Sequence, residues 1–265
     1  MYLSYIIWFF FCPSELRIVI PPSCRIHNTT FTQEGCGACA AFALSTAASM
    51  HLCLGQGVDR IPSPYRLFDC GGARCGKGSS VTSLYPALGV SDLRDSPQRF
   101  GLRCREYTRL DVSSIHQPYA LASEYEIKSA MLLSGKPVIG IVKGELWRDI
   151  ATGIFIHINT QSNHALVIVG WGNSPYPHWV VKNSWGESWG DAGYGRVHTS
   201  ALISALDLTG EAKHCERLEI WIIASFGVVF PMLAMCSIIV LQFYECWEKL
   251  RRHRYKEVEQ LFDGV

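Results

Sequence analysis

A cysteine stands at the start of the clearest predicted helix in this chain. From Cys39 to about Leu54 the sequence is dominated by Ala, Leu and Met, and Gly55 and Gly57 follow as helix-ending signals. The backbone dipole places partial positive charge at a helix N-terminus, and this charge favours the thiolate form of a cysteine located there. Gln33 precedes Cys39 by six positions. The segment therefore predicts a reactive thiol, with a buried structural cysteine as the alternative.

Composition limits the partners and the compartment of the protein. The 265 residues suffice for one two-lobed domain of about 200 residues with attachments. A formal net charge of only +1 gives no electrostatic basis for binding nucleic acid. The 11 cysteines are more than a cytosolic enzyme of this size usually carries, which indicates an oxidising compartment. Because the count is odd, at least one thiol stays outside any set of intrachain disulfides.

An uncharged stretch near the C-terminus predicts a transmembrane helix. Residues 220–241 contain no charged side chain, and about 22 residues at about 1.5 Å each can cross a hydrocarbon core of about 30 Å. Aromatic residues flank the stretch, and a basic run follows at 249–256. Because positive residues stay on the cytosolic side, we expect a single-pass type I helix at 218–244, a cytosolic tail at 245–265, and a luminal or extracellular N-terminal domain. A buried core helix is the alternative.

Two features of the N-terminal region bear on targeting. Residues 1–13 form an apolar, aromatic segment that is too short to span a membrane. We interpret this segment either as the remnant of a signal peptide or as the truncated start of a longer chain. Asn28-Thr29-Thr30 is a sequon for N-linked glycosylation, which makes Asn28 a candidate modification site.

Predicted helices come before predicted strands along the chain. After the helix that begins at Cys39, a second helix is predicted from Ser123 to Ser134, because Gly135 and Pro137 follow it. Separate helical and strand regions predict the α+β class, with a break between two lobes near residues 110–120. The predicted strands are at 138–142, 165–169, 179–182 and 194–197.

Two later blocks supply the groups that a cysteine nucleophile needs, namely a base and a side chain that orients the base. Residues 162–172 read SNHALVIVGWG and place His164 before an apolar run. Residues 181–190 read VKNSWGESWG and contain Asn183. Taken singly, His164 is better explained as a core histidine and Asn183 as a turn residue.

Taken together with QEGCGACAAFA at 33–43, these blocks resemble the papain family of cysteine proteases, and in particular its cathepsin-like members. The blocks occur in the order of that family. The resemblance covers about residues 14–215, and it implies a papain-like peptidase domain with two lobes. The helical lobe is expected at about 25–115 and a β-barrel-like lobe at about 116–215.

The resemblance implies a role for each of four catalytic residues. Cys39 matches the nucleophile, His164 the imidazole that pairs with it, and Asn183 the side chain that orients the imidazole. Gln33 matches the amide of the oxyanion hole, which acts together with the backbone N–H of Cys39. Trp185 would shield the hydrogen bond between Asn183 and His164 from water. The implied reaction is hydrolysis of peptide bonds through an acyl-enzyme intermediate, with no cofactor.

The same resemblance implies two disulfides in the helical lobe. Cys215 lies near the family's position for a third bridge, but its partner stays open between Cys24, Cys53 and none. No zinc or other metal site is predicted, because no four ligands stand at metal-binding spacing. The two implied pairs are Cys36–Cys75 and Cys70–Cys104.

A substrate groove is implied next to the reactive thiol. Gly78 would let an extended substrate backbone pair with the enzyme, and the neighbouring side chains predict an apolar preference at P2. Two residues depart from the family's pattern: Ala40 replaces the tryptophan that usually follows the nucleophile, and Lys77 replaces a glycine. The residues expected to contact substrate are Gly78, Ser79, Ser80, Ile141, Ala165 and Trp185.

Two functions agree with these patterns. The first is an active, membrane-anchored cysteine endopeptidase that acts on peptides or proteins in the lumen of lysosomes, endosomes or vacuoles, or at the cell surface. The second is a catalytically weak or inactive membrane-bound homologue that serves as a binding protein or receptor. The intact set of Gln33, Cys39, His164 and Asn183 favours the enzyme, whereas Ala40 favours the homologue. No motif predicts an oligomeric state.

Overall fold

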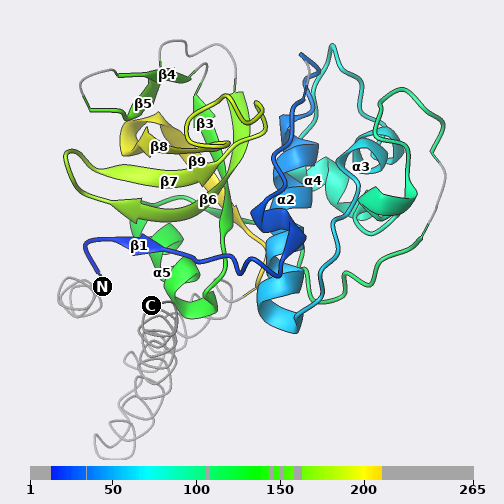
Figure 1. Cartoon of the computed structure of the whole chain (residues 1–265), viewed down its shortest axis with the longest axis horizontal. Coiled ribbons are helices and arrows are strands. Elements are labelled where there is room, and N and C mark those ends of the chain that lie inside the picture. The colour runs from blue at the N-terminus through cyan, green and yellow to red at the C-terminus, as the bar shows by residue number, and fades with distance from the viewer. Residues whose placement is uncertain are drawn as a thin grey trace, which may run out of the picture.

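The computed structural model describes residues 13–33, 35–104, 108–143, 146–149, 152–157 and 163–210. Figure 1 shows two halves side by side, one helical and one built on a β-sheet. Helix α2 (Cys39–Gln56) stands between the halves and packs against strands on one side and helices on the other. The α+β class predicted from the sequence is confirmed.

Helix α2 forms where the sequence predicts it. Gly57 follows it with a left-handed φ of 67°, and the Gly57 N–H bonds to the carbonyl of Cys53. Every residue from Ala40 to Leu52 is buried, because elements of both halves cover the helix. A helix with apolar residues on all sides is stable only in such a position.

The helical half contains a second helix that the sequence did not predict. Helix α3 (Pro64–Cys70) includes Asp69 and Cys70, and Ser63 caps this helix by accepting a hydrogen bond from the backbone N–H of Arg66. Proline at the first helical position is a start signal that the sequence interpretation did not use. The other helical segments of this half are α4 (Val81–Leu84), η1 (Arg25–His27), η2 (Tyr85–Ala87) and η3 (Leu93–Asp95).

The second half is a mostly antiparallel sheet of nine strands. Strand β6 (Asn163–Gly172) lies at its centre, pairs with β3 (Val138–Lys143) and β7 (His178–Lys182), and is buried from its second residue onward. The order is β2-β9-β3-β6-β7-β8-β5-β4, and β1 also pairs with β6. The remaining elements are β1 (Leu16–Arg17), β2 (Tyr119–Leu121), β4 (Leu146–Arg148), β5 (Phe155–His157), β8 (Tyr194–His198), η4 (Thr199–Ala201) and β9 (Leu202–Asp207).

Helix α5 (Glu124–Ser134) belongs to the sheet half, where it packs beside β9. Ser123 and Glu126 form a capping box at its start, and Gly135 ends it with a φ of 64°. The sequence predicted this helix to within one residue, because both of its ends carry local signals.

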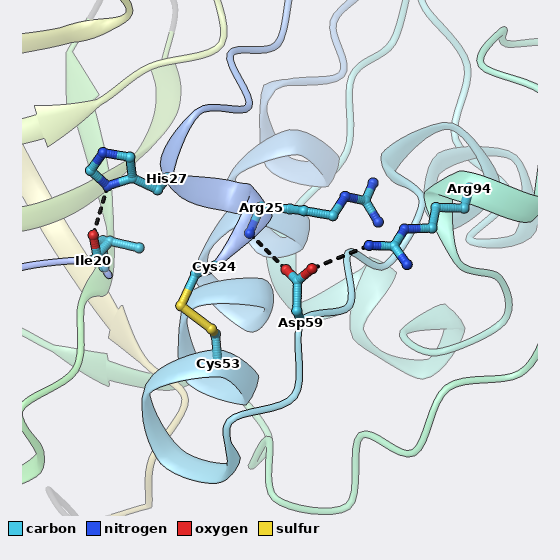
Figure 2. Close-up of a disulfide and its surroundings, with 7 residues drawn as sticks. All are labelled: Ile20, Cys24, Arg25, His27, Cys53, Asp59 and Arg94. Carbon is cyan, nitrogen blue, oxygen red and sulfur yellow. Dashed lines mark hydrogen bonds and ion pairs between the residues drawn. A yellow bond between two sulfur atoms is a disulfide. The ribbon is translucent and has the colours of Figure 1, made fainter. Parts of the chain in front are cut away.

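The segment of residues 13–33, here called the strap, fastens to both halves. On the sheet half, the backbone N–H of Ile18 donates to the carbonyl of Val169 at 2.7 Å. On the helical half, Cys24 forms a disulfide with Cys53, near the end of α2 (Figure 2). The sequence left the partners of both cysteines open, and the structure pairs them with each other.

A polar contact fastens the strap beside this disulfide. The carboxylate of Asp59 accepts a hydrogen bond from the backbone N–H of Arg25 at 2.7 Å and pairs with the guanidinium of Arg94 at 3.2 Å (Figure 2). Further along the strap, the ring nitrogen Nδ1 of His27 lies 2.6 Å from the carbonyl oxygen of Ile20. The course of the strap toward residue 33 is therefore fixed by covalent and polar contacts.

Several predictions fall outside the described residues. These are the transmembrane helix at 218–244, the tail at 245–265, the pairing of Cys215, and all of the segment 1–13 except its last residue. In the part of the chain that the structure describes, no helix is both long and apolar enough to cross a bilayer.

Candidate active site

Cys39 is the first residue of α2 and, among the described cysteines, the one that is not in a disulfide. Its side chain is half-buried. Ala38 holds the N-cap position and offers no side-chain cap. Within the described residues, no acceptor meets the backbone N–H of Cys39. A helix start with an unpaired N–H beside a thiol favours negative charge at that place.

A disulfide-bonded loop lies directly against the residues that precede Cys39. Cys36 pairs with Cys75, as the resemblance implies, and the N–H of Gly37 donates to the carbonyl of Cys75 at 3.1 Å. A Cβ atom at Gly37 would lie 2.9 Å from that carbonyl oxygen and 3.2 Å from the Cα of Gly78. Only glycine therefore lets the loop come this close to the start of α2.

The second pair that the resemblance implies is also present, since Cys70 at the end of α3 is bonded to Cys104. The Asp69 carboxylate beside it accepts hydrogen bonds from the backbone N–H groups of Gly101 and Leu102. The bridge and these bonds tie the segment at 101–104 to α3.

His164 and Asn183 lie on neighbouring strands and are hydrogen-bonded. His164 is the second residue of β6, and Asn183 follows directly after β7. The Nε2 atom of His164 lies 2.7 Å from the Oδ1 atom of Asn183. The backbone N–H of Asn183 donates to the carbonyl of Gly193 at 2.9 Å, which fixes the main chain at this point. The other ring nitrogen of His164, Nδ1, is not bonded to Asn183.

Trp185 covers this hydrogen bond from one side. Its ring centre lies 4.5 Å from that of His164, at an interplanar angle of 33°. Trp189 packs edge-on against Trp185 at 6.0 Å and stacks on Phe155 at 4.3 Å, so the covering ring is itself held in place. His164 is only 6% exposed as a result. Exclusion of water strengthens the bond between His164 and Asn183.

Burial also decides the charge of the His164 ring. Loss of solvation lowers the pKa of His164 to about 4, although its hydrogen bond to Asn183 acts in the opposite direction. The ring beside a neutral thiol is therefore uncharged near neutral pH. Formation of the imidazolium requires the thiolate of Cys39, because a nearby negative charge favours the protonated ring.

Gln33 is held at the end of the strap by the residue that follows Asn183. Its backbone N–H donates to the carbonyl of Ser184 at 3.0 Å. The Ser184 hydroxyl in turn donates to the side-chain oxygen Oε1 of Gln33 at 2.8 Å. These bonds fix the orientation of the amide, so that its nitrogen Nε2 points toward Cys36, whose carbonyl accepts one of its hydrogens at 3.0 Å. One Nε2–H remains for another acceptor.

Helix α2 packs against strand β6, and this contact places Cys39 and His164 on elements that touch. Within the described residues, no hydrogen bond joins the thiol to the imidazole. The structure thus links His164 directly to Asn183 and Trp185, and Gln33 to Ser184. Cys39 stands at the start of the helix that packs against β6.

Comparison with known proteins decides the family. The family described as papain family cysteine protease matches residues 22–207. This chain belongs to that family. Mouse cathepsin O is 32% identical over 190 residues, which cover 65% of this chain and 60% of that protein. Human cathepsin O is 30% identical over 199 residues, covering 66% and 58%. The chain therefore spans about three fifths of the length of these two relatives.

Solved structures of the papain family share the fold. The cysteine protease CMS1MS2 of Carica candamarcensis, solved in complex with E-64, superposes with a TM-score of 0.60 at 21% identity, over 74% of this chain and 98% of that one. Procathepsin B S9 of Trypanosoma congolense superposes with a TM-score of 0.58 at 20% identity, over 75% and 77%. At these identities the likeness concerns the fold alone.

The residues expected to contact substrate lie in two groups within this papain-family fold. Gly78, with a φ of 65°, belongs to the helical half, and its N–H donates to the carbonyl of Arg74 at 3.1 Å. Ser79 next to it has a buried hydroxyl without a hydrogen-bond partner in the described part of the chain. Ser80 accepts a hydrogen bond from the Ser83 N–H and so caps α4. This last residue has a structural task that the sequence interpretation missed.

The second group lies on the sheet half. Ile141 of β3 stands directly opposite Ala165 of β6 in the antiparallel register. Ala165 is buried and Ile141 is half-buried, and Ala165 directly follows His164 in β6. Ser184 is the main site residue that the sequence interpretation missed. Its place next to Asn183 is the signal that could have suggested it.

Proposed function

We propose that this chain is a cysteine endopeptidase that hydrolyses peptide bonds with Cys39 as nucleophile, His164 as acid and base, and Asn183 as the residue that orients His164. The observation that carries the proposal is the buried hydrogen bond of 2.7 Å between His164 and Asn183 under the Trp185 ring. A histidine that only fills the core needs neither this hydrogen bond nor a half-buried thiol on the helix that packs against its strand. A nucleophile, a base and an orienting group together constitute a catalytic set.

In the first step, the thiolate sulfur of Cys39 attacks the carbonyl carbon of the substrate, and a carbon–sulfur bond forms. The negative oxygen is stabilised by the backbone N–H of Cys39 and the remaining Nε2–H of Gln33. The Nδ1–H of His164 then protonates the leaving amine, and the carbon–nitrogen bond breaks. The neutral ring that remains agrees with the low pKa that burial gives His164.

In the second step, His164 Nδ1 takes a proton from water, and the water oxygen attacks the acyl carbon. The carbon–sulfur bond breaks and releases the acid product, and the thiolate and imidazolium are restored. Asn183 keeps the ring in one orientation through both steps, because its Oδ1 remains bonded to Nε2.

Two apolar residues of the sheet half support a preference for an apolar P2 side chain. Ile141 and Ala165 lie opposite each other on the strands next to His164, and the buried hydroxyl of Ser79 lies next to Gly78 on the helical half. An extended substrate would run along the Gly78 backbone, where the absence of a side chain permits close approach. Trp185 would contact the substrate on the far side of the thiol.

The location of the enzyme belongs to the same proposal. A membrane anchor at 218–244 with the peptidase domain on the luminal or extracellular side is supported by the uncharged run and by the basic residues after it. The three disulfides of the described residues agree with an oxidising compartment. The proposed locations are lysosomes, endosomes or vacuoles, with the cell surface as the alternative.

A second candidate function is that of a catalytically weak homologue that binds peptides without cleaving them. Ala40 favours it, because the family usually has a tryptophan after the nucleophile, and here a small side chain is buried at that position. The lack of a hydrogen bond between thiol and imidazole in the described part of the chain is a second observation in its favour.

Titration with an epoxide that alkylates activated thiols separates the two functions. We expect the full-length protein to incorporate one epoxide per chain, at Cys39 by peptide mapping, and to cleave peptides with apolar P2 residues. Cys39→Ala should abolish labelling and cleavage, and His164→Ala should slow both. If folded protein binds peptide but neither reacts at Cys39 nor cleaves it, the enzyme proposal fails and the binding homologue is favoured.

A further inference from the structure

Asn28 occupies an exposed position on an otherwise anchored part of the strap. It follows the short turn η1, with φ and ψ of −95° and 0°, and its backbone N–H donates to the carbonyl of Arg25. Ile26, two residues before it, is only 1% exposed. Cys24, which forms the disulfide with Cys53, is also 1% exposed. The chain therefore turns its apolar and bonded side chains inward and the Asn28 side chain outward.

The Asn28 side chain has no task in the described part of the fold. No hydrogen bond to its amide is found there, whereas the side chains of His27, Thr29 and Thr30 are each hydrogen-bonded. The Thr29 hydroxyl donates to the Arg25 carbonyl at 2.8 Å, and the Thr30 hydroxyl donates to the Ala192 carbonyl at 3.1 Å. An exposed, unbonded amide can carry a large substituent without disturbing the protein.

Asn28-Thr29-Thr30 is also the single Asn-X-Ser/Thr triplet in the 265 residues. The other observation that points to modification lies four positions away. The buried Cys24–Cys53 disulfide needs an oxidising compartment, and in eukaryotic cells that compartment is where oligosaccharides are transferred to asparagine. Sequence motif, exposure and disulfide bonding thus agree at one short segment.

We infer that Asn28 carries an N-linked oligosaccharide, added as the chain enters the secretory pathway. The Nδ2 atom of Asn28 forms a bond to the anomeric carbon of an oligosaccharide linked to a lipid diphosphate. The bond from that carbon to the phosphate oxygen breaks, the lipid diphosphate leaves, and the transferase accepts the amide proton. This inference is independent of the proposed peptidase activity.

The sequon threonine gives a matched set of variants. The Thr30 methyl group lies 2.6 Å from the position that a Cβ atom at Gly193 would take, so the site around Thr30 is closely packed. Thr30→Ser keeps the hydroxyl and the sequon, whereas Thr30→Ala removes both. Asn28→Gln changes only an exposed side chain and also destroys the sequon.

The test is expression of the full chain in insect or mammalian cells, followed by peptide mapping with and without a glycosidase that converts the modified asparagine to aspartate. We expect a glycan at Asn28, one discrete mobility step on deglycosylation, retention in Thr30→Ser, and loss in Thr30→Ala and Asn28→Gln. A non-reducing map of Cys24–Cys53 reports both luminal entry and folding for each variant.

Two outcomes overturn the inference. One is a chain with the Cys24–Cys53 bridge formed and Asn28 unmodified. The other is a chain whose cysteines stay reduced and whose Asn28 is bare, because the inference includes entry into the secretory pathway. If the protein is fully glycosylated but the epoxide does not label Cys39, the peptidase proposal is contradicted and the glycosylation inference stands.

Discussion

Asn183 accepts hydrogen bonds from Nε2 of His164 and from the backbone N–H of Ser184 through the same side-chain oxygen, at 2.7 and 2.8 Å. The second bond fixes the plane of the amide, and the first uses that plane to orient the imidazole. The Nδ2 atom of Asn183 is buried without a partner in the described residues, which costs about 1–3 kcal/mol. The side chain is thus arranged for the ring rather than for its own stability.

Substitution of Asn183 by alanine should lower kcat/KM by about 10- to 100-fold. The estimate follows from loss of a hydrogen bond to a group that becomes charged, worth about 1.5–3 kcal/mol. Steady-state hydrolysis of a peptide with an apolar P2 residue measures it. Asn173→Ala, at an exposed turn, is the matched control and should leave kcat/KM unchanged. Equal activity of Asn183→Ala and the parent protein would contradict the orienting role.

Gln33→Ala should reduce kcat by about 100- to 1000-fold with little change in KM, because an oxyanion donor acts mainly in the transition state. Stopped-time hydrolysis assays over a range of substrate concentration separate kcat from KM. The control is Gln98→Ala, since Gln98 is an exposed glutamine of the helical half. A rise in KM at constant kcat would show that Gln33 binds substrate instead.

Ser184→Ala should lower kcat by a smaller amount, about 3- to 10-fold, because it removes only the hydroxyl that holds Oε1 of Gln33 at 2.8 Å. Its effect should vanish in the Gln33→Ala background, because the two residues act through one amide. The double-variant kinetics measure this coupling. Additive losses would mean that Ser184 acts independently of Gln33.

Replacing Cys24 and Cys53 together by alanine should lower the free energy of unfolding by about 3–4 kcal/mol. The bridge joins residues 29 positions apart in the sequence. Its removal gives the unfolded chain more conformational entropy, and this gain accounts for the expected loss of stability. Urea unfolding followed by fluorescence measures the change. Cys39→Ala removes a cysteine outside any bridge and should change stability much less. Unchanged stability of the double variant would show that the bridge does not constrain the strap.

Stability should also fall as pH decreases from about 6.5 to about 4, in part because of His51 on α2. Burial lowers the pKa of His51 to about 4; Lys136 nearby acts in the same direction, while the Pro137 carbonyl and Asp207 oppose it. The unfolded chain therefore binds a proton that the folded chain excludes. The contribution of neutral His51 to the free energy of unfolding is complete above pH 6.5. It is lost as the pH falls toward 4, and the total loss is about 3 kcal/mol.

Thermal unfolding of His51→Gln across this pH range measures the effect. The glutamine amide can still donate to the Pro137 carbonyl, which His51 Nε2 contacts at 2.7 Å, but it does not titrate. We expect a shallower loss of stability between pH 6.5 and 4 in this variant. Identical slopes for the two proteins would contradict the assignment to His51.

Helices α2 and α5 were predictable because their signals are local. Composition, a capping box and a closing glycine act within a few residues of the chain. Strand β9 and helix α3 were not predicted as elements. Strand β9 is stabilised by β2 and β3, which precede it by more than 50 residues, and no local pattern reports such a partner.

The candidate site divides in the same way. Cys39, His164 and Asn183 could be proposed as catalytic residues from three short sequence blocks. Each block contains one of these residues, and the order of the blocks along the chain matches that of the family. The Cys24–Cys53 pairing could not, because several cysteines were equally available. The same is true of the bond between Ser184 and Gln33, which are 151 positions apart. Contacts of this kind depend on which surfaces meet when the strap, α2 and the sheet pack together, and packing is a property of the whole chain.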